Sequence, residues 1–368
     1  MSAAADIPPA DLARYSRQMR FEHVGVEGQR RLRQARAVLV GCGALGSVLA
    51  GTLVRAGIGA LRLIDRDYLE LSNLQRQMLF DEDDVAEDLP KAEAAARKLR
   101  RVNSQVEIEP VVADLHADNA ERLCAGAHVI LDGTDNLETR FLLNDVAVKH
   151  GIPWVYGACL GAEGLVLPIL PRQTACLRCV WDEPPPPGSL PTCDTVGVLA
   201  SAVSVVAGLQ AVEALKILMG RHDDVNRHLA AVDVWTGRVR AINVQAAFET
   251  RACPCCARGQ YDFLTAARGS LVTVLCGRDA VQIRPRLGSG PHTPDPAGPA
   301  EMVRGAPALF EAVRRRLPAA CQARGNAFIL QFEADGCIVT LFRDGRAIIK
   351  GTSEPAVARA LYARYIGI

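Results

Sequence analysis

Three glycines at positions 41, 43 and 46 form the pattern in this sequence that could most directly do chemistry. They stand in the run Gly41-Cys42-Gly43-Ala44-Leu45-Gly46, after a short apolar stretch and before residues with helical spacing. Glycines placed there let the backbone approach a phosphate at the start of a helix, where free N–H groups and the helix dipole favour an anion. The spacing therefore predicts a turn that binds the phosphates of a nucleotide.

An acidic residue follows this turn at the distance expected of a ribose ligand. Asp65 ends a second apolar run, 19 residues after Gly46, where a carboxylate can accept hydrogen bonds from ribose hydroxyls. Taken alone, the glycines and this acid favour NAD over ATP. They also leave open a glycine turn that only lets a helix pack tightly.

Polar and cationic residues continue beyond the acid, where a triphosphate would extend. Asp65-Arg66-Asp67 leads to Ser72-Asn73-Leu74-Gln75-Arg76-Gln77 and then to Pro90-Lys91. Phosphoryl chemistry needs cations that stabilise charge in the transition state, whereas hydride transfer does not need such a cluster. A solvated charged loop would have the same composition, and the spacing alone does not separate the two.

Two Cys-x-x-Cys pairs stand far apart in the chain. They are Cys176-Leu-Arg-Cys179 and Cys253-Pro-Cys-Cys256, among 12 cysteines in all. Four thiolates at this spacing suit a closed tetrahedral zinc site, while a thioredoxin-like redox function would need one pair and not two. Cys255 makes the second pair ambiguous, and we choose Cys256 because it preserves two intervening residues.

Cys193 is a candidate nucleophile. It follows the run Glu183-Pro-Pro-Pro-Pro-Gly188 and precedes a long apolar stretch, so we expect it between this proline loop and the N-terminus of a long helix near residues 198–219. A helix N-terminus lowers the pKa of a thiol and improves its nucleophilicity. The alternative is a thiol on a flexible loop, and the neighbouring Asp194 would repel a thiolate.

The elements that must position these residues alternate between strand and helix. Short apolar runs and helical stretches follow one another from Arg36 to Tyr156, which predicts an α/β fold with a doubly wound, Rossmann-like and mostly parallel sheet. We expect a helical arm over residues 1–34, a nucleotide-binding domain over 35–258 that includes the cysteine pairs, and a smaller α+β domain over 262–368.

The expected C-terminal domain shows strong turn signals. A glycine- and proline-rich linker, Leu287–Pro299, precedes a predicted helix that ends at Arg316. The pairs Asp335-Gly336 and Asp344-Gly345 predict a three-stranded meander, and Ser353 is predicted to cap a last helix. No motif in this domain carries an assignable chemistry.

Charge and hydropathy limit the kinds of partner and compartment. The 368 residues carry a formal net charge of +1, which gives no reason to propose nucleic acid or an anionic membrane as the partner. The apolar stretches Ala37–Val54 and Thr195–Val212 contain glycine, serine or glutamine and are expected to be buried core elements. The N-terminus lacks a secretory signal, so we expect a cytoplasmic protein.

Five motifs, in this order along the chain, resemble the ThiF/MoeB/HesA family, the bacterial relatives of ubiquitin-activating enzymes. The resemblance covers roughly Arg14 to Cys256, and other details look closest to ThiF-type members with an extra C-terminal domain. The motifs are Arg14-Tyr15-Ser16-Arg17-Gln18, the turn from Gly41 to Gly46, Ser72 to Gln77, Lys91, and Asp132-Gly133-Thr134-Asp135-Asn136.

The resemblance implies an ATP-dependent adenylyltransferase. In such an enzyme, the C-terminal Gly-Gly carboxylate of a ubiquitin-fold sulfur carrier attacks the α-phosphate of ATP, giving acyl-AMP and pyrophosphate. The resemblance also implies a homodimer in which Arg17 reaches the ATP of the other subunit. In this family Asp65 would bind the ribose, Asn73, Arg76 and Lys91 the phosphates, and Asp135 Mg²⁺. The other implied nucleotide ligands are Gly41, Gly43, Gly46, Asp67 and Asn136. Cys176, Cys179, Cys253 and Cys256 would hold zinc, and Cys193 matches a loop cysteine that takes part in thioester or persulfide chemistry.

Other functions stay open at this point. A NAD-dependent oxidoreductase would share the glycine turn and Asp65 but would leave Arg76, Lys91 and the four cysteines unexplained. A non-catalytic carrier-binding scaffold and an enzyme that activates a carboxyl group on a modified tRNA are further alternatives. The sequence does not say whether the carrier serves thiamine, molybdopterin or tRNA thiolation, nor whether a cysteine desulfurase or a rhodanese supplies the sulfur.

Overall fold

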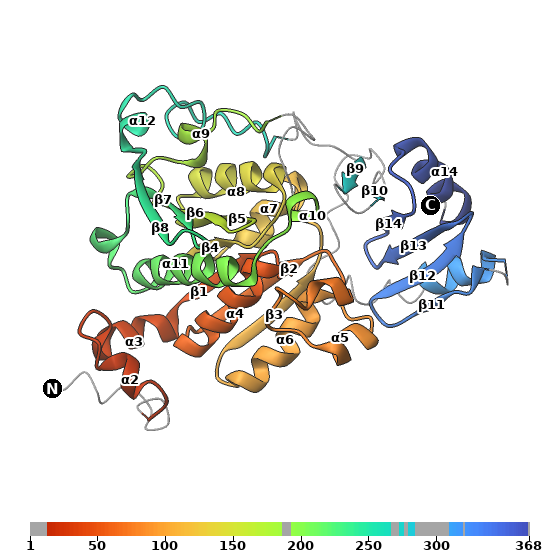
Figure 1. Cartoon of the computed structure of the whole chain (residues 1–368), viewed down its shortest axis with the longest axis horizontal. Coiled ribbons are helices and arrows are strands. Elements are labelled where there is room, and N and C mark those ends of the chain that lie inside the picture. The colour runs from red at the N-terminus through yellow and green to blue at the C-terminus, as the bar shows by residue number, and fades with distance from the viewer. Residues whose placement is uncertain are drawn as a thin grey trace. The chain divides into compact units, whose positions relative to one another are not determined.

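The computed structural model describes residues 13–185, 193–265, 272–275, 279–283, 309–318 and 321–366. The chain divides into two compact units, the first formed by residues 1–186 and 197–269 and the second by residues 187–196 and 270–368 (Figure 1). The predicted linker Leu287–Pro299 lies outside the described residues.

The first unit is built on one eight-stranded sheet with the strand order β3-β2-β1-β4-β5-β6-β7-β8. The strands from β3 to β5 are parallel to one another, and those from β5 to β8 are antiparallel. This mostly parallel, doubly wound half confirms the predicted fold class. The strands are β1 Arg36–Val40, β2 Ala60–Asp65, β3 Glu107–Val112, β4 Val129–Asp132, β5 Trp154–Leu160, β6 Glu163–Ile169, β7 His228–Asp233 and β8 Arg238–Asn243.

Helices cover both faces of this sheet, because alternate strand residues point to opposite sides (Figure 1). Leu39 of β1 belongs to one buried cluster, together with residues of α4 (Ala44–Ala56), α6 (Lys91–Val102) and α11 (Ala200–Leu218). Val38, its neighbour on β1, belongs to the other cluster, with residues of α7 (Ala117–Cys124) and α8 (Leu137–His150). The shorter helices of this unit are α2 Ser16–Met19, α3 Gly25–Gln34, η2 Leu71–Asn73, α5 Glu82–Ala86, α9 Leu177–Val180, η3 His222–Asp224 and α12 Gln245–Glu249.

Helix α11 is long and apolar enough to cross a membrane by length and composition alone. Its residues are 56% buried over the most apolar window. Val203, Val206 and Ala207 on this helix lie in the same cluster as residues of α4. The apolar composition of α11 is therefore explained by its position in the core of the first unit, as the sequence predicted.

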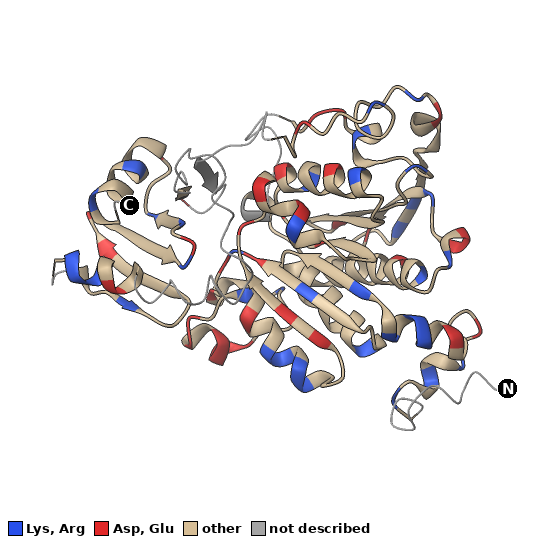
Figure 2. Cartoon of the chain, turned by 180° about the vertical axis from the view of Figure 1, so that it is seen from behind, with Lys and Arg blue, Asp and Glu red and all other residues tan. Residues whose placement is uncertain are grey.

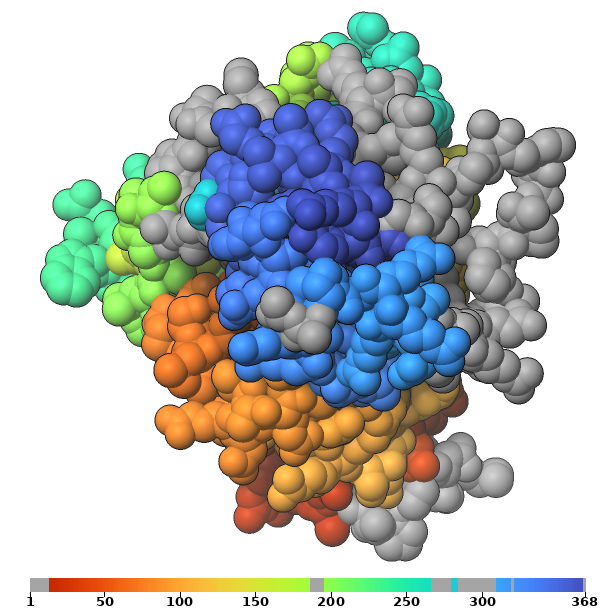
Figure 3. All heavy atoms as spheres, turned by 90° about the vertical axis from the view of Figure 1, so that its right-hand side faces the viewer, coloured from red at the N-terminus to blue at the C-terminus, as the bar shows by residue number. Residues whose placement is uncertain are grey.

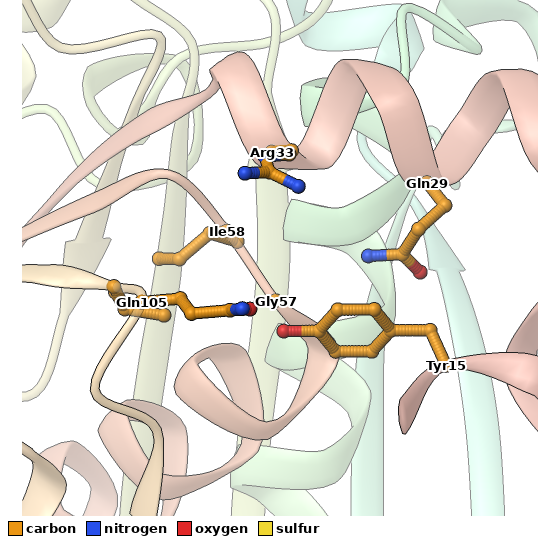
Figure 4. A pocket seen from close by; sticks show the side chains of 7 residues that line it. Tyr15, Gln29, Arg33, Gly57, Ile58 and Gln105 are labelled. Carbon is orange, nitrogen blue, oxygen red and sulfur yellow. The ribbon is translucent and has the colours of Figure 1, made fainter. Parts of the chain in front are cut away.

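The N-terminal arm, α2 and α3, packs at the end of α4 that is remote from the glycine turn. The ring of Tyr15 occupies the space beside Gly57, and the amide of Gln29 donates to the carbonyl of Ala56 over 3.0 Å. A cavity of about 20 Å³ lies beside this contact, between Tyr15, Arg33 and Gln105 (Figure 4). This volume suits a single water molecule and is far too small for a nucleotide.

Charged residues hold the segment after β2 against α6. Figure 2 shows the acidic helix α5 beside the basic side of α6. Lys98 on α6 pairs with Asp84 over 3.0 Å and also with Asp81, the residue that caps α5. Because this segment carries Asn73 and Arg76, the ion pairs help to fix candidate site residues relative to the sheet.

The second unit contains a six-stranded antiparallel sheet with the order β11-β12-β13-β14-β10-β9. Helical residues 309–316 and α14 (Pro355–Tyr365) pack on one face of it, and Figure 3 shows the residues of this unit in light to dark blue. The predicted cap was wrong, because Glu354 precedes α14 and the hydroxyl of Ser353 donates to Asp279 instead. The strands are β9 Val272–Leu275, β10 Ala280–Ile283, β11 Arg324–Gly325, β12 Ile329–Ala334, β13 Cys337–Phe342 and β14 Ala347–Lys350.

Candidate active site

The candidate nucleotide residues gather where β1 and β4 lie side by side. From β1 the chain continues to β2 on one side, and from β4 it continues to β5 on the other. Ligands of doubly wound sheets bind at such a switch point, beyond the carboxyl ends of the strands. Gly41 follows β1, Asp65 ends β2 and Gly133 follows β4, so all three stand at this edge.

Close backbone packing explains three of the glycines at this edge. Gly41 has a φ of +89°, and a β-carbon on Gly46 would lie only 1.9 Å from the carbonyl oxygen of Gly41. A β-carbon on Gly133 would lie 2.4 Å from the same oxygen. Around Gly43, by contrast, the nearest atom would be 3.9 Å away. Packing therefore requires Gly41, Gly46 and Gly133, whereas Gly43 leaves room for a ligand.

The start of α4 offers hydrogen-bond donors beside that room. Gly43 is the N-cap residue, and among the described residues no side chain caps the helix. The first N–H groups of a helix have no partner within it, and together with the helix dipole they attract an anion. The turn therefore combines space and donors at one point, as a phosphate site requires.

Replacing Gly46 with alanine is expected to destabilise the first unit and to remove nucleotide binding. The new methyl group would collide with the Gly41 carbonyl, and rigid backbone leaves little room for relaxation. Gly208 on α11 is the matched control, since a β-carbon there meets nothing within 4 Å and alanine is the better helix former. Thermal unfolding should give a lower melting temperature for Gly46→Ala and an equal or higher one for Gly208→Ala; equal values for both would contradict this account.

Asp65 is buried, and its carboxylate braces the turn. One oxygen accepts from the N–H of Cys42 over 2.6 Å and the other accepts from the N–H of Asp67 over 2.7 Å. Burial raises the pKa of Asp65 and the nearby Asp67 adds to this, while Lys91 acts in the opposite sense. Each carboxylate oxygen can accept a second bond, so Asp65 can brace the turn and still bind a ribose hydroxyl.

Lys91 is brought back to this edge by the segment between β2 and α6. The N–H of Lys91 donates to the carbonyl of Asp67 over 2.9 Å, and its Nζ lies 3.2 Å from the Asp67 carboxylate. The side chain of Lys91 is almost completely buried. A buried ammonium needs a paired anion, so Asp67 holds Lys91 beside the Asp65 carboxylate.

Asn73 and Arg76 lie on the same segment, in and after η2. The side chain of Asn73 is buried and accepts from the N–H of Glu70 over 3.2 Å. Arg76 is half-buried, and its guanidinium donates to the carbonyl of Ser72 over 2.9 Å. Most N–H donors of the Arg76 guanidinium are thus left for another acceptor. The amide oxygen of Asn73 already accepts a bond within the turn.

Asp135 is exposed, in a loop between β4 and α8. The alternative in which Asp135 caps α8 is wrong, because the side chain of Asn136 accepts from the N–H of Glu138 over 2.8 Å and serves as the cap. Asp135 is among the carboxylates that raise the pKa of both Arg66 and Arg140 against the lowering effect of burial. Its carboxylate therefore lies near the guanidinium groups of Arg66 and Arg140, at the edge that holds the turn.

Two residues that sequence reasoning missed fix this loop. The guanidinium of Arg140 donates to the Asp132 carboxylate over 3.0 Å, to the Thr134 carbonyl over 2.7 Å and to the Gly157 carbonyl over 2.9 Å. Gln210 on α11 donates to the carbonyl of Asp132 over 2.9 Å. These contacts join β4, β5 and α11, so no local signal in the sequence could have revealed them.

Arg17 is far from the turn within its own chain. It is exposed on α2, two residues after Tyr15, which packs at the remote end of α4. Because α4 has 13 residues, that end lies about 20 Å from the glycine turn. Arg17 therefore does not join the other candidate residues within one chain.

The four predicted cysteines lie together. The sulfurs of Cys176, Cys179, Cys253 and Cys256 all fall within 4.8 Å of one another. Three of the separations are 3.6 Å for Cys176–Cys253, 3.8 Å for Cys176–Cys179 and 3.5 Å for Cys179–Cys256. Disulfide sulfurs would stand about 2 Å apart, and sulfurs on a tetrahedral zinc ion about 3.8 Å apart. The thiolate donor set and the spacing both fit a zinc ion.

Cys255 has a different position from its neighbour Cys256. Its sulfur is buried and donates to the Asp145 carboxylate over 3.4 Å, and it receives the amide of Asn144 over 3.3 Å. The same amide lies 3.8 Å from the sulfur of Cys176. The choice of Cys256 in the second pair agrees with this arrangement, and Cys255 connects the cluster to α8.

Cys193 begins a separate short helix, α10 (Cys193–Val196). It precedes the long helix, as expected, without being part of its first turn. Gly197 has a φ of +79°, and α11 begins only at Ala200 with Leu199 as its N-cap residue. A left-handed residue ends a helix, so α10 and α11 are separate helices.

This fold and this edge define a nucleotide-binding protein of the doubly wound class, with a thiolate cluster attached to the sheet. The chain belongs to the ThiF family, which it matches over residues 15–255. The match spans the arm, the glycine turn, the Asp135 loop and the first three cysteines of the cluster.

Several named proteins are similar to this chain. The sulfur carrier protein ThiS adenylyltransferase of Bacillus subtilis is 41% identical over 355 residues, which cover 96% of this chain and 99% of that protein. The SAMP-activating enzyme E1 of Haloferax volcanii is 39% identical over 251 residues, which cover 68% of this chain and 91% of that protein. The fold resembles a crystal structure of E. coli MccB + MccA-N7isoASN, with a TM-score of 0.58, 21% identity and coverage of 68% of this chain and 76% of the other.

Proposed function

We propose that this protein is an ATP-dependent adenylyltransferase that activates the C-terminal carboxylate of a ubiquitin-fold sulfur carrier. The observation that carries the proposal is the grouping of the open turn at Gly43, the acid Asp65 and the buried cation Lys91 at one edge of the sheet. The names of the similar proteins support the same activity, since two of them are a carrier-protein adenylyltransferase and an activating enzyme E1.

The residues divide the proposed reaction among them. Asp65 orients the ribose and the turn binds phosphate, so the α-phosphorus is held for attack by a carboxylate oxygen of the carrier. A P–O bond to the carrier forms as the bond to pyrophosphate breaks. Arg76 and Lys91 stabilise the negative charge that develops on the leaving phosphates. Stabilising charge that develops in the transition state usually makes the largest contribution to catalysis.

Asp135 would hold Mg²⁺ in this scheme. A single carboxylate together with the phosphates and water is a common ligand set for this ion, and the exposed Asp135 carboxylate allows it. When bound, the ion supplies positive charge to the phosphate oxygens. The rigid loop under Asp135 keeps its carboxylate in place for that contact.

The cysteine cluster would hold a structural zinc ion. With four thiolates the coordination is complete, which leaves no open position for a substrate. The ion would join the segment after β6 to the segment after α12 and so stabilise the first unit. Cysteine pairs of this kind more often bind metal than form disulfides in a reducing compartment, which supports a cytoplasmic location.

The carrier is proposed to be of the ThiS type. The ThiS adenylyltransferase of B. subtilis matches this chain over almost its whole length, and thus includes the second unit. The matched region of the SAMP-activating enzyme E1 covers 68% of this chain. The sulfur donor would be a separate protein such as a cysteine desulfurase or a rhodanese.

The direct test is ATP–pyrophosphate exchange with purified carriers that end in Gly-Gly. Labelled pyrophosphate should appear in ATP only when the carrier is present, and a carrier shortened by its last glycine should not support exchange. Exchange that needs no carrier, or none with any Gly-Gly carrier despite ATP binding, would contradict the proposed function. Binding of NAD in preference to ATP would favour an oxidoreductase.

If Arg17 acts in the partner's site, the protein is a homodimer in which each active site contains residues of both chains. Neither Arg17→Ala nor Lys91→Ala should be active alone, whereas a mixture allowed to exchange subunits should regain about a quarter of wild-type exchange, since half of the dimers then contain one complete site of two. The control is a mixture of Lys91→Ala with Lys149→Ala, a surface lysine of α8 paired with Glu121. It should give about half of wild-type exchange, because only the Lys91→Ala chains lack a complete site. If the Arg17→Ala and Lys91→Ala mixture stays inactive while dimers exchange, Arg17 does not act across subunits.

A further inference from the structure

Gln77 is a buried polar residue that the assigned ligands do not include. Its side chain is 2% exposed, and its Oε1 has no hydrogen-bond partner within the described part of the chain. Leaving a buried amide oxygen unsatisfied lowers stability, so such a group in a folded protein needs an explanation.

The backbone around Gln77 fixes where this amide lies. Gln77 follows η2, where its N–H donates to the Asn73 carbonyl over 2.9 Å, and Phe80 donates back to the Gln77 carbonyl over 3.1 Å. Phe80 is anchored in the same buried cluster as α4. The side chain of Gln77 is therefore held on a turn that packs against the glycine-turn helix.

The amide points to the open part of the turn. Its Nε2 atom lies 3.9 Å from the point where a β-carbon on Gly43 would stand, and nothing else comes nearer to that point. Gly43 is also the residue that precedes the uncapped start of α4. The amide of Gln77 and the uncapped start of α4 thus lie next to the same small region at Gly43.

We propose that Gln77 is a further nucleotide-binding residue, whose amide donates to a phosphate oxygen above Gly43 and whose Oε1 accepts from a donor that arrives with the nucleotide. The proposal rests on the proposed function, because it takes the ligand of the turn to be ATP. A neutral amide donates a directed hydrogen bond to the phosphate, in addition to the positive charge of Arg76 and Lys91. In the nucleotide-free protein the amide oxygen of Gln77 then lacks a partner because that partner arrives with the nucleotide.

Three variants test this role by isothermal titration with ATP and by thermal unfolding with and without ATP. Gln77→Met keeps the length of the side chain without its polar atoms and should weaken ATP binding about tenfold. Gln77→Glu places a carboxylate toward the phosphates and should weaken it about a hundredfold or more. Gln75→Met, at an exposed position in the same turn, should stay within about twofold of wild type.

The nucleotide-free proteins separate a ligand role from a structural one. Gln77→Met removes an unsatisfied buried oxygen, so without ATP it should melt at the wild-type temperature or above, and only its stabilisation by ATP should shrink. Wild-type affinity in Gln77→Met, or a melting temperature several degrees lower without ATP, would overturn the inference alone. A wild-type protein that binds no ATP would overturn both the inference and the proposed function.

Discussion

Asp135→Ala is expected to lower the rate of ATP–pyrophosphate exchange by about a hundredfold to a thousandfold, because a metal that neutralises phosphate charge contributes several kcal/mol to the transition state. The melting temperature should not change, since the Asp135 side chain is exposed and Asn136, not Asp135, caps α8. The rate of exchange at increasing Mg²⁺ concentration measures this loss. Asp135→Asn should lose most of the activity that Asp135→Ala loses.

Asp118 provides the matched control for this experiment. It is another exposed acid beside a helix start, in the first turn of α7, and its side chain is 89% exposed. Asp118→Ala should exchange at the wild-type rate. Wild-type exchange in Asp135→Ala would show that Asp135 does not bind the metal and would move that role to another carboxylate at this edge.

Cys256→Ser is expected to remove bound zinc and to lower the free energy of unfolding of the first unit by about 4 kcal/mol, the loop-closure entropy of a chain segment of this size. Cys179 and Cys256 stand 77 residues apart in sequence, as do Cys176 and Cys253, and the cluster closes this long loop. Zinc content per chain and unfolding in denaturant measure the two effects. A chelator should lower the stability of the wild-type protein in the same way.

Cys255→Ser separates the two neighbouring cysteines. Because the Cys255 sulfur is bonded to Asp145 and Asn144, its serine variant should retain one zinc ion per chain. A variant that loses zinc at Cys255 and keeps it at Cys256 would show that the ligand set is Cys176, Cys179, Cys253 and Cys255. Equal zinc content in wild type and Cys256→Ser would contradict a four-thiolate site.

Local signals made the sheet and the glycine turn predictable from the sequence. Glycine spacing depends on backbone contacts within a few residues, such as the approach of Gly46 to Gly41, and apolar runs mark buried parallel strands. The Cys-x-x-Cys pairs were predictable for the same reason, because two ligands of one ion stand on one short turn.

The rest of the site depends on contacts between distant residues. Gln210 bonds a carbonyl 78 residues away in sequence, and Arg140 joins the ends of two strands. The wrong prediction of Ser353 as a cap concerns a helix start. Pro355 begins α14 after Glu354, and the hydroxyl of Ser353 bonds Asp279 instead. Which of several neighbouring residues begins a helix depends on its tertiary contacts, and these cannot be read from the local sequence.

The packing of α11 against α4 determines when the first unit can be completed during synthesis. The strands and helices of the nucleotide edge all precede residue 151, yet the apolar side of α4 is covered by a helix that begins at Ala200. A ribosome adds about 5 to 20 residues per second, so the new chain exposes that side for several seconds before α11 emerges. The last two thiolates, Cys253 and Cys256, arrive later still. The newly made nucleotide half thus exposes the apolar side of α4 until α11 is synthesised, and such exposed surface is what favours aggregation of partly made chains.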